Sequence, residues 1–409
     1  MNKALNICLV IFFLLYAIGQ FSADIKMVSR LFYICFIFLT IFFIACRKSI
    51  SVPTGYNDVL FFLYLFFSTL YGIHNGFLGS ALNEMSAFAS LWLSWKIIFF
   101  SYENKLLDII LIQKYLYNMM ILWFLGYIFV AGGAILGFIP NDIIVALLSE
   151  WLKNRGMSID IAEDLLQGSS GLLGMMPRLA TGLNIVPLII LLLHTYKNKG
   201  ANPVVWLMGL LFVLIDYGRI DILVFGMATI FAVMPSVKKI LNSDKGILFF
   251  FFFLVSFVLA AVFIFDKELL EFFQSVFANY RTQASNFERI SQYNDLMEAI
   301  ATAPFIGGGL GAYILNNIRN DINYWEYELQ LLAFVLQLGI LGFLAVVVNF
   351  VLDYVFSVWQ HIRGCRMVFM FTFGVWIVAS CLQGGIFFDG KLILPILFFM
   401  SLRPEKSGI

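Results

Sequence analysis

Long uncharged stretches constrain this chain more than any other feature of its sequence. The clearest covers residues 246–265, twenty positions without one charged side chain. A helix of about 20 apolar residues is long enough to cross the hydrocarbon core of a bilayer. The whole chain is 61% hydrophobic and 12% charged, whereas soluble domains carry about 25% charged residues. The sequence therefore predicts an all-α, multi-pass membrane protein that forms a single domain over residues 1–409.

Apolar runs of similar length recur along the chain and predict about twelve membrane-spanning helices. In chain order the expected spans are 5–23, 31–46, 56–73, 81–100, 112–139, 180–196, 201–215, 220–235, 246–265, 329–352, 367–388 and 390–402. Most of them are free of charge, and Lys96 within 81–100 stands out. A formal net charge of +1 gives no indication of a nucleic-acid partner. The His and Cys residues are scattered without the spacing of metal ligands, so no metal or cofactor is expected.

The Lys and Arg residues predict how the chain is oriented. If the N-terminus is cytoplasmic, the loops on that side receive most of the basic residues, including Lys105 and Lys197. The short loops on the other side hold only Lys26, Arg30, Arg219 and Lys391. Because cytoplasmic loops carry the excess of Lys and Arg, both termini are expected in the cytoplasm.

Two long loops, 140–179 and 266–328, fall on the non-cytoplasmic side in this topology. Loops longer than about 15 residues are uncommon unless they are functional. The first is expected to contain short helices at 141–152 and 158–167. The second leads directly into the span at 329–352, so it is expected to form a folded polar cap at the membrane surface.

The second loop contains a predicted amphipathic helix. Ser285-x-x-Glu288 fits a capping box, in which the Ser hydroxyl and the Glu carboxylate satisfy N–H groups at a helix start. Apolar residues then recur at helical spacing: Phe287, Ile290, Tyr293, Met297 and Ile300. Pro304 is expected to end the helix. The glycine cluster 307–311 that follows favours a tight turn. The alternative is a phosphate cradle of backbone N–H groups, although the cluster lacks the G-K-S/T ending of a nucleotide loop.

Four arginines lie near spans on the non-cytoplasmic side: Arg178, Arg219, Arg281 and Arg289. Arg219 belongs to the turn 216–221, which also holds two Asp and joins two uncharged runs of 16 residues each. Charges at the depth of such short spans are usually paired or functional. Guanidinium groups match phosphate oxygens in pairs and stay charged, so the four residues are candidates for gripping a pyrophosphate that carries a lipid tail. The alternatives are interfacial anchoring and, for the loop residues, a plain solvated charge.

The order of these pieces resembles the bacterial O-antigen polymerase and ligase superfamily (Wzy/WaaL-like). An Arg on an amphipathic helix is followed by P-F-I-G-G-G-L-G at 304–311 and then by a polar residue about a dozen positions before G-I-L-G at 339–342. Arg178, entering a span, and the Y-G-R step at 217–219 are similar to further pieces of the pattern. The family's R-x-x-G-x-x-N spacing is altered after Arg178, and Glu328 stands where the family typically has a His.

The resemblance implies a GT-C-like membrane glycosyltransferase of a bacterial inner membrane with a periplasmic active site. It is most like an O-antigen or capsular polysaccharide polymerase, with undecaprenyl-pyrophosphate-linked glycans as donor and acceptor and a chain-length regulator protein as a further partner. Arg178, Arg219, Arg281 and Arg289 would bind the pyrophosphate, and Arg289 would also take part in catalysis.

Either Glu328 or Glu326 would act as general base, without a metal. The simpler alternative is that these Glu residues only neutralise nearby Arg. Absence of a His at 328 disfavours the related reading, a ligase that transfers glycan to lipid A core. A flippase for the same lipid-linked sugars is the other alternative. It predicts charges deep in several spans, broken helices and repeat symmetry.

Overall fold

The computed structural model describes the greater part of the chain. The described residues are 2–18, 23–45, 56–140, 143, 184–198, 202–216, 219–233, 280–315, 327, 329–362, 365–382 and 386–402. Their regular structure is helical, without a strand, which confirms the predicted all-α class for this part of the chain. The span expected at 246–265 and most of the first long loop lie outside the described residues.

The helices follow the apolar runs of the sequence. They are α1 (Asn2–Ile18), α2 (Ala23–Ala45), α3 (Tyr56–His74), α4 (Leu78–Glu103), α5 (Ile109–Ile135), α8 (Ile185–Asn198), α9 (Pro203–Asp216), α10 (Arg219–Val233), α14 (Tyr280–Thr302), α15 (Gln330–Phe343), a π-helical turn η1 (Leu344–Val348), α16 (Asn349–Trp359), α17 (Arg366–Leu382) and α18 (Ile386–Ser401). Most of these helices overlap a predicted span, whereas α14 comes from the second long loop.

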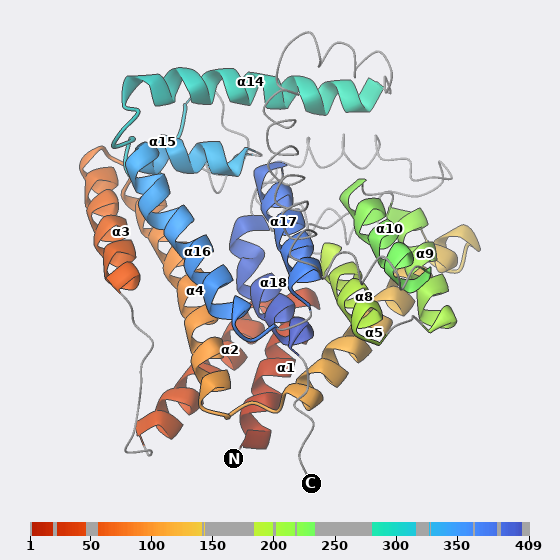
Figure 1. The fold of residues 1–409 in the computed structure, drawn as a ribbon. Helices are drawn as coiled ribbons and strands as arrows, with labels where there is room; N and C mark the ends of the chain where they lie inside the picture. The colour runs from red at the N-terminus through yellow and green to blue at the C-terminus, as the bar shows by residue number, and fades with distance from the viewer. Residues whose placement is uncertain are drawn as a thin grey trace.

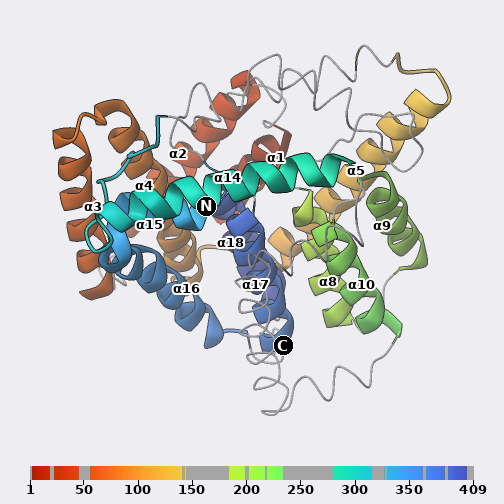
Figure 2. The same ribbon diagram turned by 90° about the horizontal axis from the view of Figure 1, so that it is seen from above.

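The helices form a bundle with a cap at one end (Figure 1). Helix α14 lies across the top of the bundle, and the first part of α15 runs crosswise beneath it. The start of α1 and the end of α18 lie at the opposite end of the bundle (Figure 1). Figure 2, seen from above, shows α14 passing over α15 toward α5 and α9. The second long loop therefore contributes a cap, as the sequence predicts.

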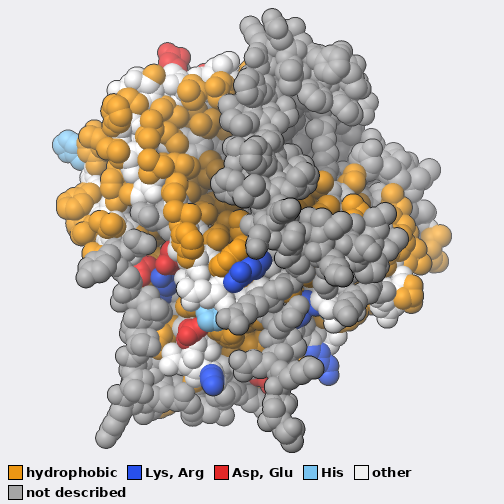
Figure 3. All heavy atoms as spheres, viewed as in Figure 1, with side chains coloured by type: hydrophobic (Ala, Val, Ile, Leu, Met, Phe, Trp, Pro, Cys, Tyr) orange, Lys and Arg blue, Asp and Glu red, His pale blue; other side chains and the backbone are white. Residues whose placement is uncertain are grey.

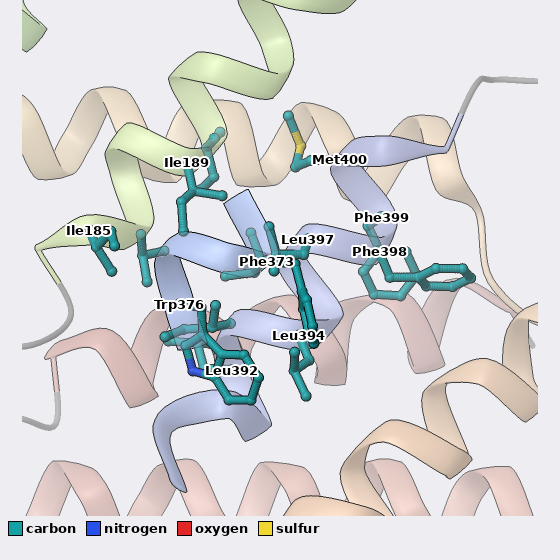
Figure 4. Packing of buried hydrophobic residues seen from close by; sticks show 14 of the residues in the cluster. Ile185, Ile189, Phe373, Trp376, Leu392, Leu394, Leu397, Phe398, Phe399 and Met400 are labelled. Atoms are coloured by element: carbon teal, nitrogen blue, oxygen red, sulfur yellow. The ribbon is translucent and has the colours of Figure 1, made fainter. Parts of the chain in front are cut away.

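Large apolar side chains form the core of the bundle. The residues labelled in Figure 4 come from α8, α17 and α18, with Trp376 and Phe373 packed among Leu392, Leu394 and Leu397. Trp95 of α4 packs against Tyr354 of α16, with ring centroids 4.5 Å apart. A buried aromatic side chain removes about 150–250 Å² of its surface from contact with solvent. These rings therefore account for much of the packing between helices.

Polar groups tie the helices together at the end away from α14. Lys197 of α8 donates to the carbonyl of Leu402 at 2.6 Å and to Gln113 Oε1 of α5 at 3.0 Å. The positive charge therefore lies at the C-terminal end of α18, where the helix dipole favours a cation. Lys105 directly follows α4 at the same end. Both are residues that the sequence assigns to the cytoplasmic loops.

Within the part of the chain that the structure describes, two segments are long and apolar enough to cross a membrane, Ile109–Gly133 and Gln330–Trp359. The remaining apolar helices of the described residues are shorter. Figure 3 shows a broad hydrophobic surface on the upper part of the molecule, with charged side chains gathered below it. Exposed patches of this size mark contacts with membranes or other proteins. These features suggest membrane association, while the twelve spans and their orientation stay predictions.

Candidate active site

The structure describes the backbone of three predicted site residues. Arg219 is the first residue of α10, while Arg281 and Arg289 belong to α14. The side chains of these three, together with all of Arg178, Glu326 and Glu328, lie outside the described residues. Their convergence on one ligand therefore stays a prediction. The described groups that surround these positions still indicate what kind of site this end of the molecule could form.

Helix α14 begins and packs differently from its prediction. It starts at or before Tyr280, so Ser285 lies inside the helix and the capping box is wrong. It ends at Thr302, as Pro304 predicts. Leu296 and Ile300 are buried, but Met297 is 42% exposed, so the buried face is turned away from part of the predicted apolar stripe. The buried face carries the polar Gln292, fully enclosed, which the apolar pattern alone could not reveal.

The register of α14 relates the two arginine positions to this buried face. At 100° per residue, position 281 lies about 20° from position 292 around the helix, and position 289 lies about 60° from it. By helical geometry alone, both positions fall within about 60° of Gln292 around the helix axis. The buried side of α14 faces a small apolar cluster with α15, in which Leu296 and Ile300 pack with Leu329, Ala333 and Leu336.

Tyr327 fixes the segment that leads into α15. It is 1% exposed, and its phenolic oxygen accepts a hydrogen bond from the backbone N–H of Ile314 at 2.7 Å. Burial raises the pKa of Tyr327 to about 12, and the negative charge of Asp295 adds to the shift. The phenol therefore stays protonated at physiological pH. The predicted bases Glu326 and Glu328 are its two neighbours in sequence.

Beneath α15, two polar side chains flank a contact between aromatic rings. Phe88 of α4 and Phe334 of α15 have ring centroids 5.0 Å apart. Glu84 lies one turn before Phe88, and Gln330 one turn before Phe334; both are almost completely buried. A buried carboxylate is costly unless it is paired or hydrogen-bonded, so such a group commonly marks a functional or a structural charge network. The sequence interpretation emphasised Lys96 and overlooked Glu84, which lies in the same predicted span.

The glycine cluster forms a turn in which the N–H groups of residues 307–310 are already bonded. Gly307 donates to Ala303 at 2.9 Å, Gly308 to Leu336 at 2.8 Å, Gly309 to Gln337 at 2.9 Å and Leu310 to Ser68 at 3.0 Å, each acceptor being a backbone carbonyl. A phosphate cradle needs free N–H groups that point at the anion. Four of the five N–H groups of the cluster are engaged in this way, which disfavours the phosphate cradle and supports the tight turn.

The same turn explains why the predicted span at 329–352 is not one straight helix. Gly339 has φ 67° and ψ 173°, which breaks α15. The carbonyls of Leu336 and Gln337 accept from the glycine turn, while the N–H groups of Ile340 and Leu341 donate to Pro304 and Phe305. Figure 1 shows the consequence: the chain runs crosswise up to the break and then descends through α16. The descending part, 340–359, has twenty residues, or about 30 Å.

Acidic and basic side chains also meet near the lower ends of three helices. Lys96 of α4 contacts Asp58 of α3 at 3.0 Å and Asp353 of α16 at 2.8 Å. The indole N–H of Trp92 donates to Asp58 at 2.8 Å. Lys96 is seven residues before the end of α4 and Asp353 six before the end of α16, about 10 Å from either end. The group joins three helices, near the start of α3 and about 10 Å inside the ends of α4 and α16.

The described residues contain no group of His, Cys, Asp or Glu that could hold a metal ion. Comparison of the chain with protein-family models, with curated proteins and with solved structures finds no match in any of the three.

Proposed function

We propose that the chain is a multi-pass protein of a bacterial inner membrane that polymerises lipid-linked oligosaccharide repeat units at the periplasmic face. The observation that carries the proposal is the position of α14. This helix lies across the bundle at the end away from the start of α1 and the end of α18, and Arg281 and Arg289 are two of its residues. A helix that carries two arginines at this end of the bundle suits a ligand with a diphosphate head and an apolar tail.

The proposed reaction is a direct displacement at the anomeric carbon of the donor sugar. A hydroxyl oxygen of the acceptor repeat unit forms the new glycosidic bond, and the bond between the anomeric carbon and the pyrophosphate oxygen breaks. The hydroxyl proton passes to Glu328 or Glu326. Undecaprenyl pyrophosphate leaves with the bonding electrons, and the anomeric configuration inverts.

The arginines would act on the leaving group. Arg178, Arg219, Arg281 and Arg289 would bind the pyrophosphate and stabilise the charge that develops on it, which is the role of preorganised donors in group transfer. Arg remains charged at all relevant pH values and pairs with phosphate oxygens in a bidentate manner. Such groups can neutralise the pyrophosphate without a metal ion. A chain-length regulator protein is a further partner in this proposal.

Burial of Tyr327 supports a fixed position for the proposed base. A general base must lie within hydrogen-bond reach of the proton that it removes. The hydrogen bond from Ile314 and the packing around Tyr327 fix the position of Tyr327, which stands between Glu326 and Glu328 in the sequence.

The single-residue variants Arg219→Ala, Arg289→Ala and Glu328→Gln test this function in cells. A polymerase defect leaves single repeat units attached to the final acceptor, a flippase defect leaves none, and a ligase defect leaves polymer that is not attached. The proposal predicts the first pattern for each variant. Normal long-chain ladders in all three would refute the site assignment.

A flippase for the same lipid-linked sugars is the second candidate, because two observations match its expectations. Helix α15 is broken at Gly339, and Lys96 forms ion pairs inside the bundle. In transporters, however, broken helices and charges serve binding sites near the middle of the membrane. Here the break lies at the top of the descending segment, which favours a structural role for it at one boundary. Asp353 lies about 9 Å from the lower end of that segment, so the ion pairs of Lys96 are the observation that keeps the flippase as the second candidate.

A further inference from the structure

Two large apolar side chains project from the turn between α14 and the glycine cluster. Phe305 is 64% exposed and Ile306 is 63% exposed. They follow Pro304 and lie outside any helix. Exposed single apolar residues are common on protein surfaces, so the important question is what surrounds this pair.

Backbone hydrogen bonds place the turn beside the top of a segment of membrane-crossing length. The carbonyl of Pro304 accepts from Ile340 at 2.8 Å, and that of Phe305 accepts from Leu341 at 3.3 Å. Ile340 and Leu341 belong to the segment Gln330–Trp359 and are themselves exposed. Leu344, one turn further down, is 49% exposed. The apolar surface of the descending segment therefore continues without interruption onto the turn.

The glycine cluster that directly follows the turn satisfies the main requirement for irregular backbone in hydrocarbon. Non-helical backbone is tolerated at membrane depth only where its polar groups are paired within the protein. The N–H groups of Gly307 to Leu310 all donate to carbonyls of α14, α15 or α3 and their adjoining residues. Asn75 covers the carbonyl of Gly308 with a hydrogen bond of 2.9 Å. Pro304 has no N–H group to satisfy.

We propose that the Pro304–Gly307 turn is immersed in the outer lipid layer, with Phe305 and Ile306 in contact with acyl chains. The turn would anchor the cap helix α14 to the bilayer and keep it against the bundle. This inference rests on the membrane placement proposed above, but not on the proposed reaction. We infer that lipid contacts these side chains because the same exposed apolar surface continues down a segment whose length matches the thickness of a bilayer.

Quenching by brominated lipid tests the proposal. The full-length protein is purified after replacement of its five Cys, and single Cys residues are introduced by Phe305→Cys and Ile306→Cys. Each is labelled with bimane and reconstituted in phosphatidylcholine vesicles with or without bromine on the acyl chains. Leu344→Cys serves as the control on the descending segment, and Ser291→Cys as the exposed control on α14. Because all four positions are at the surface, the labels do not enter the core.

The expected result is at least a two-fold loss of fluorescence in brominated vesicles at 305, 306 and 344, with little change at 291. Quenching at 344 but not at 305 or 306 would overturn the inference while leaving the membrane placement intact. Absence of quenching at all three would overturn both. Unquenched labels together with efficient bis-maleimide cross-linking of Phe305→Cys between copies would show that a second copy covers the turn instead of lipid.

Discussion

Substitution of Gly309 by Ala tests how the glycine cluster holds the cap on the bundle. Gly309 has φ 90°, and an added Cβ would lie 2.5 Å from the Cα of Gly72 in α3. A non-glycine residue in such a conformation costs about 1–3 kcal/mol. Overpacking against a rigid neighbour costs about 1–3 kcal/mol more. We therefore expect Gly309→Ala to lower the free energy of unfolding by about 2–6 kcal/mol.

Matched glycines separate the two contributions. Gly76 has φ 92° with nothing within 4 Å of an added Cβ, so Gly76→Ala isolates the backbone term, about 1–3 kcal/mol. Gly72 lies within helix α3, where an added Cβ would meet the backbone of Leu310, so Gly72→Ala isolates the overpacking. Gly126 of α5 has neither feature, and Gly126→Ala should stabilise the helix by about 0.5–1 kcal/mol.

The assay is unfolding by SDS in mixed micelles, followed by the fluorescence of the eight Trp residues. The expected order of destabilisation is Gly309→Ala first, then Gly72→Ala and Gly76→Ala, with Gly126→Ala at or above the stability of the native protein. Surface substitutions without a structural role usually change the free energy of unfolding by no more than about 0.5 kcal/mol. If the free energies of unfolding of Gly309→Ala and Gly126→Ala differ by no more than this, the close packing of the glycine turn on α3 is refuted.

Three further outcomes follow from the contacts described above. Lys96→Met leaves the buried Asp58 and the partly exposed Asp353 without their cation and should cost about 3 kcal/mol in the same assay, the low end for a buried pair. Lys96→Met combined with Asp58→Asn and Asp353→Asn should recover most of the loss, and equal stability of the single and triple variants would contradict this. Tyr327→Phe removes the acceptor for the N–H of Ile314 and should cost about 1–3 kcal/mol at neutral pH. The pKa of Tyr327 is raised to about 12 in the folded state, from about 10 when unfolded. The native protein should therefore be more stable than Tyr327→Phe up to about pH 10 and should lose this extra free energy of unfolding progressively above that pH. A difference in free energy of unfolding that stays constant between pH 9 and 11 would exclude this pKa shift. Finally, Arg289→Ala should reduce the rate of chain extension by about 10²-fold or more, with an unchanged midpoint in the SDS titration, and Arg289→Lys should recover only part of the rate.

The apolar runs predict most of the helices well because their period and length depend on local sequence. The span expected at 56–73 corresponds to Tyr56–His74, and that at 220–235 to Arg219–Val233. Helix boundaries fail where a distant segment decides them. The span expected at 329–352 is broken at Gly339 and continues to Trp359, because the glycine turn some thirty residues earlier supplies the hydrogen bonds at the break. No local pattern contains that pairing.

The predictions for helix α14 and for the buried polar residues fail for the same reason, because local sequence does not show which segments pack together. Ser285 and Glu288 have the spacing of a capping box, but the helix already runs through Tyr280–Ala284, so that spacing falls within it. The buried positions of Glu84 and Gln292 depend on which helices cover them, which the sequence does not reveal. The charge of Glu84 inside an apolar run was the available signal for that residue. Gln292 carries no comparable signal, since an uncharged polar residue on an amphipathic helix is expected at the surface.

Reconstitution of the purified protein with defined lipid-linked repeat units tests the central claim most directly. Proteoliposomes containing the native chain should produce a ladder of longer glycans and release undecaprenyl pyrophosphate, and the ladder should persist in the presence of EDTA. Arg289→Ala should abolish the ladder while retaining its fold. Repeat units that stay unextended by folded native protein, or a ladder equal in native protein and Arg289→Ala, would contradict the proposed polymerase and its arginine-bound leaving group.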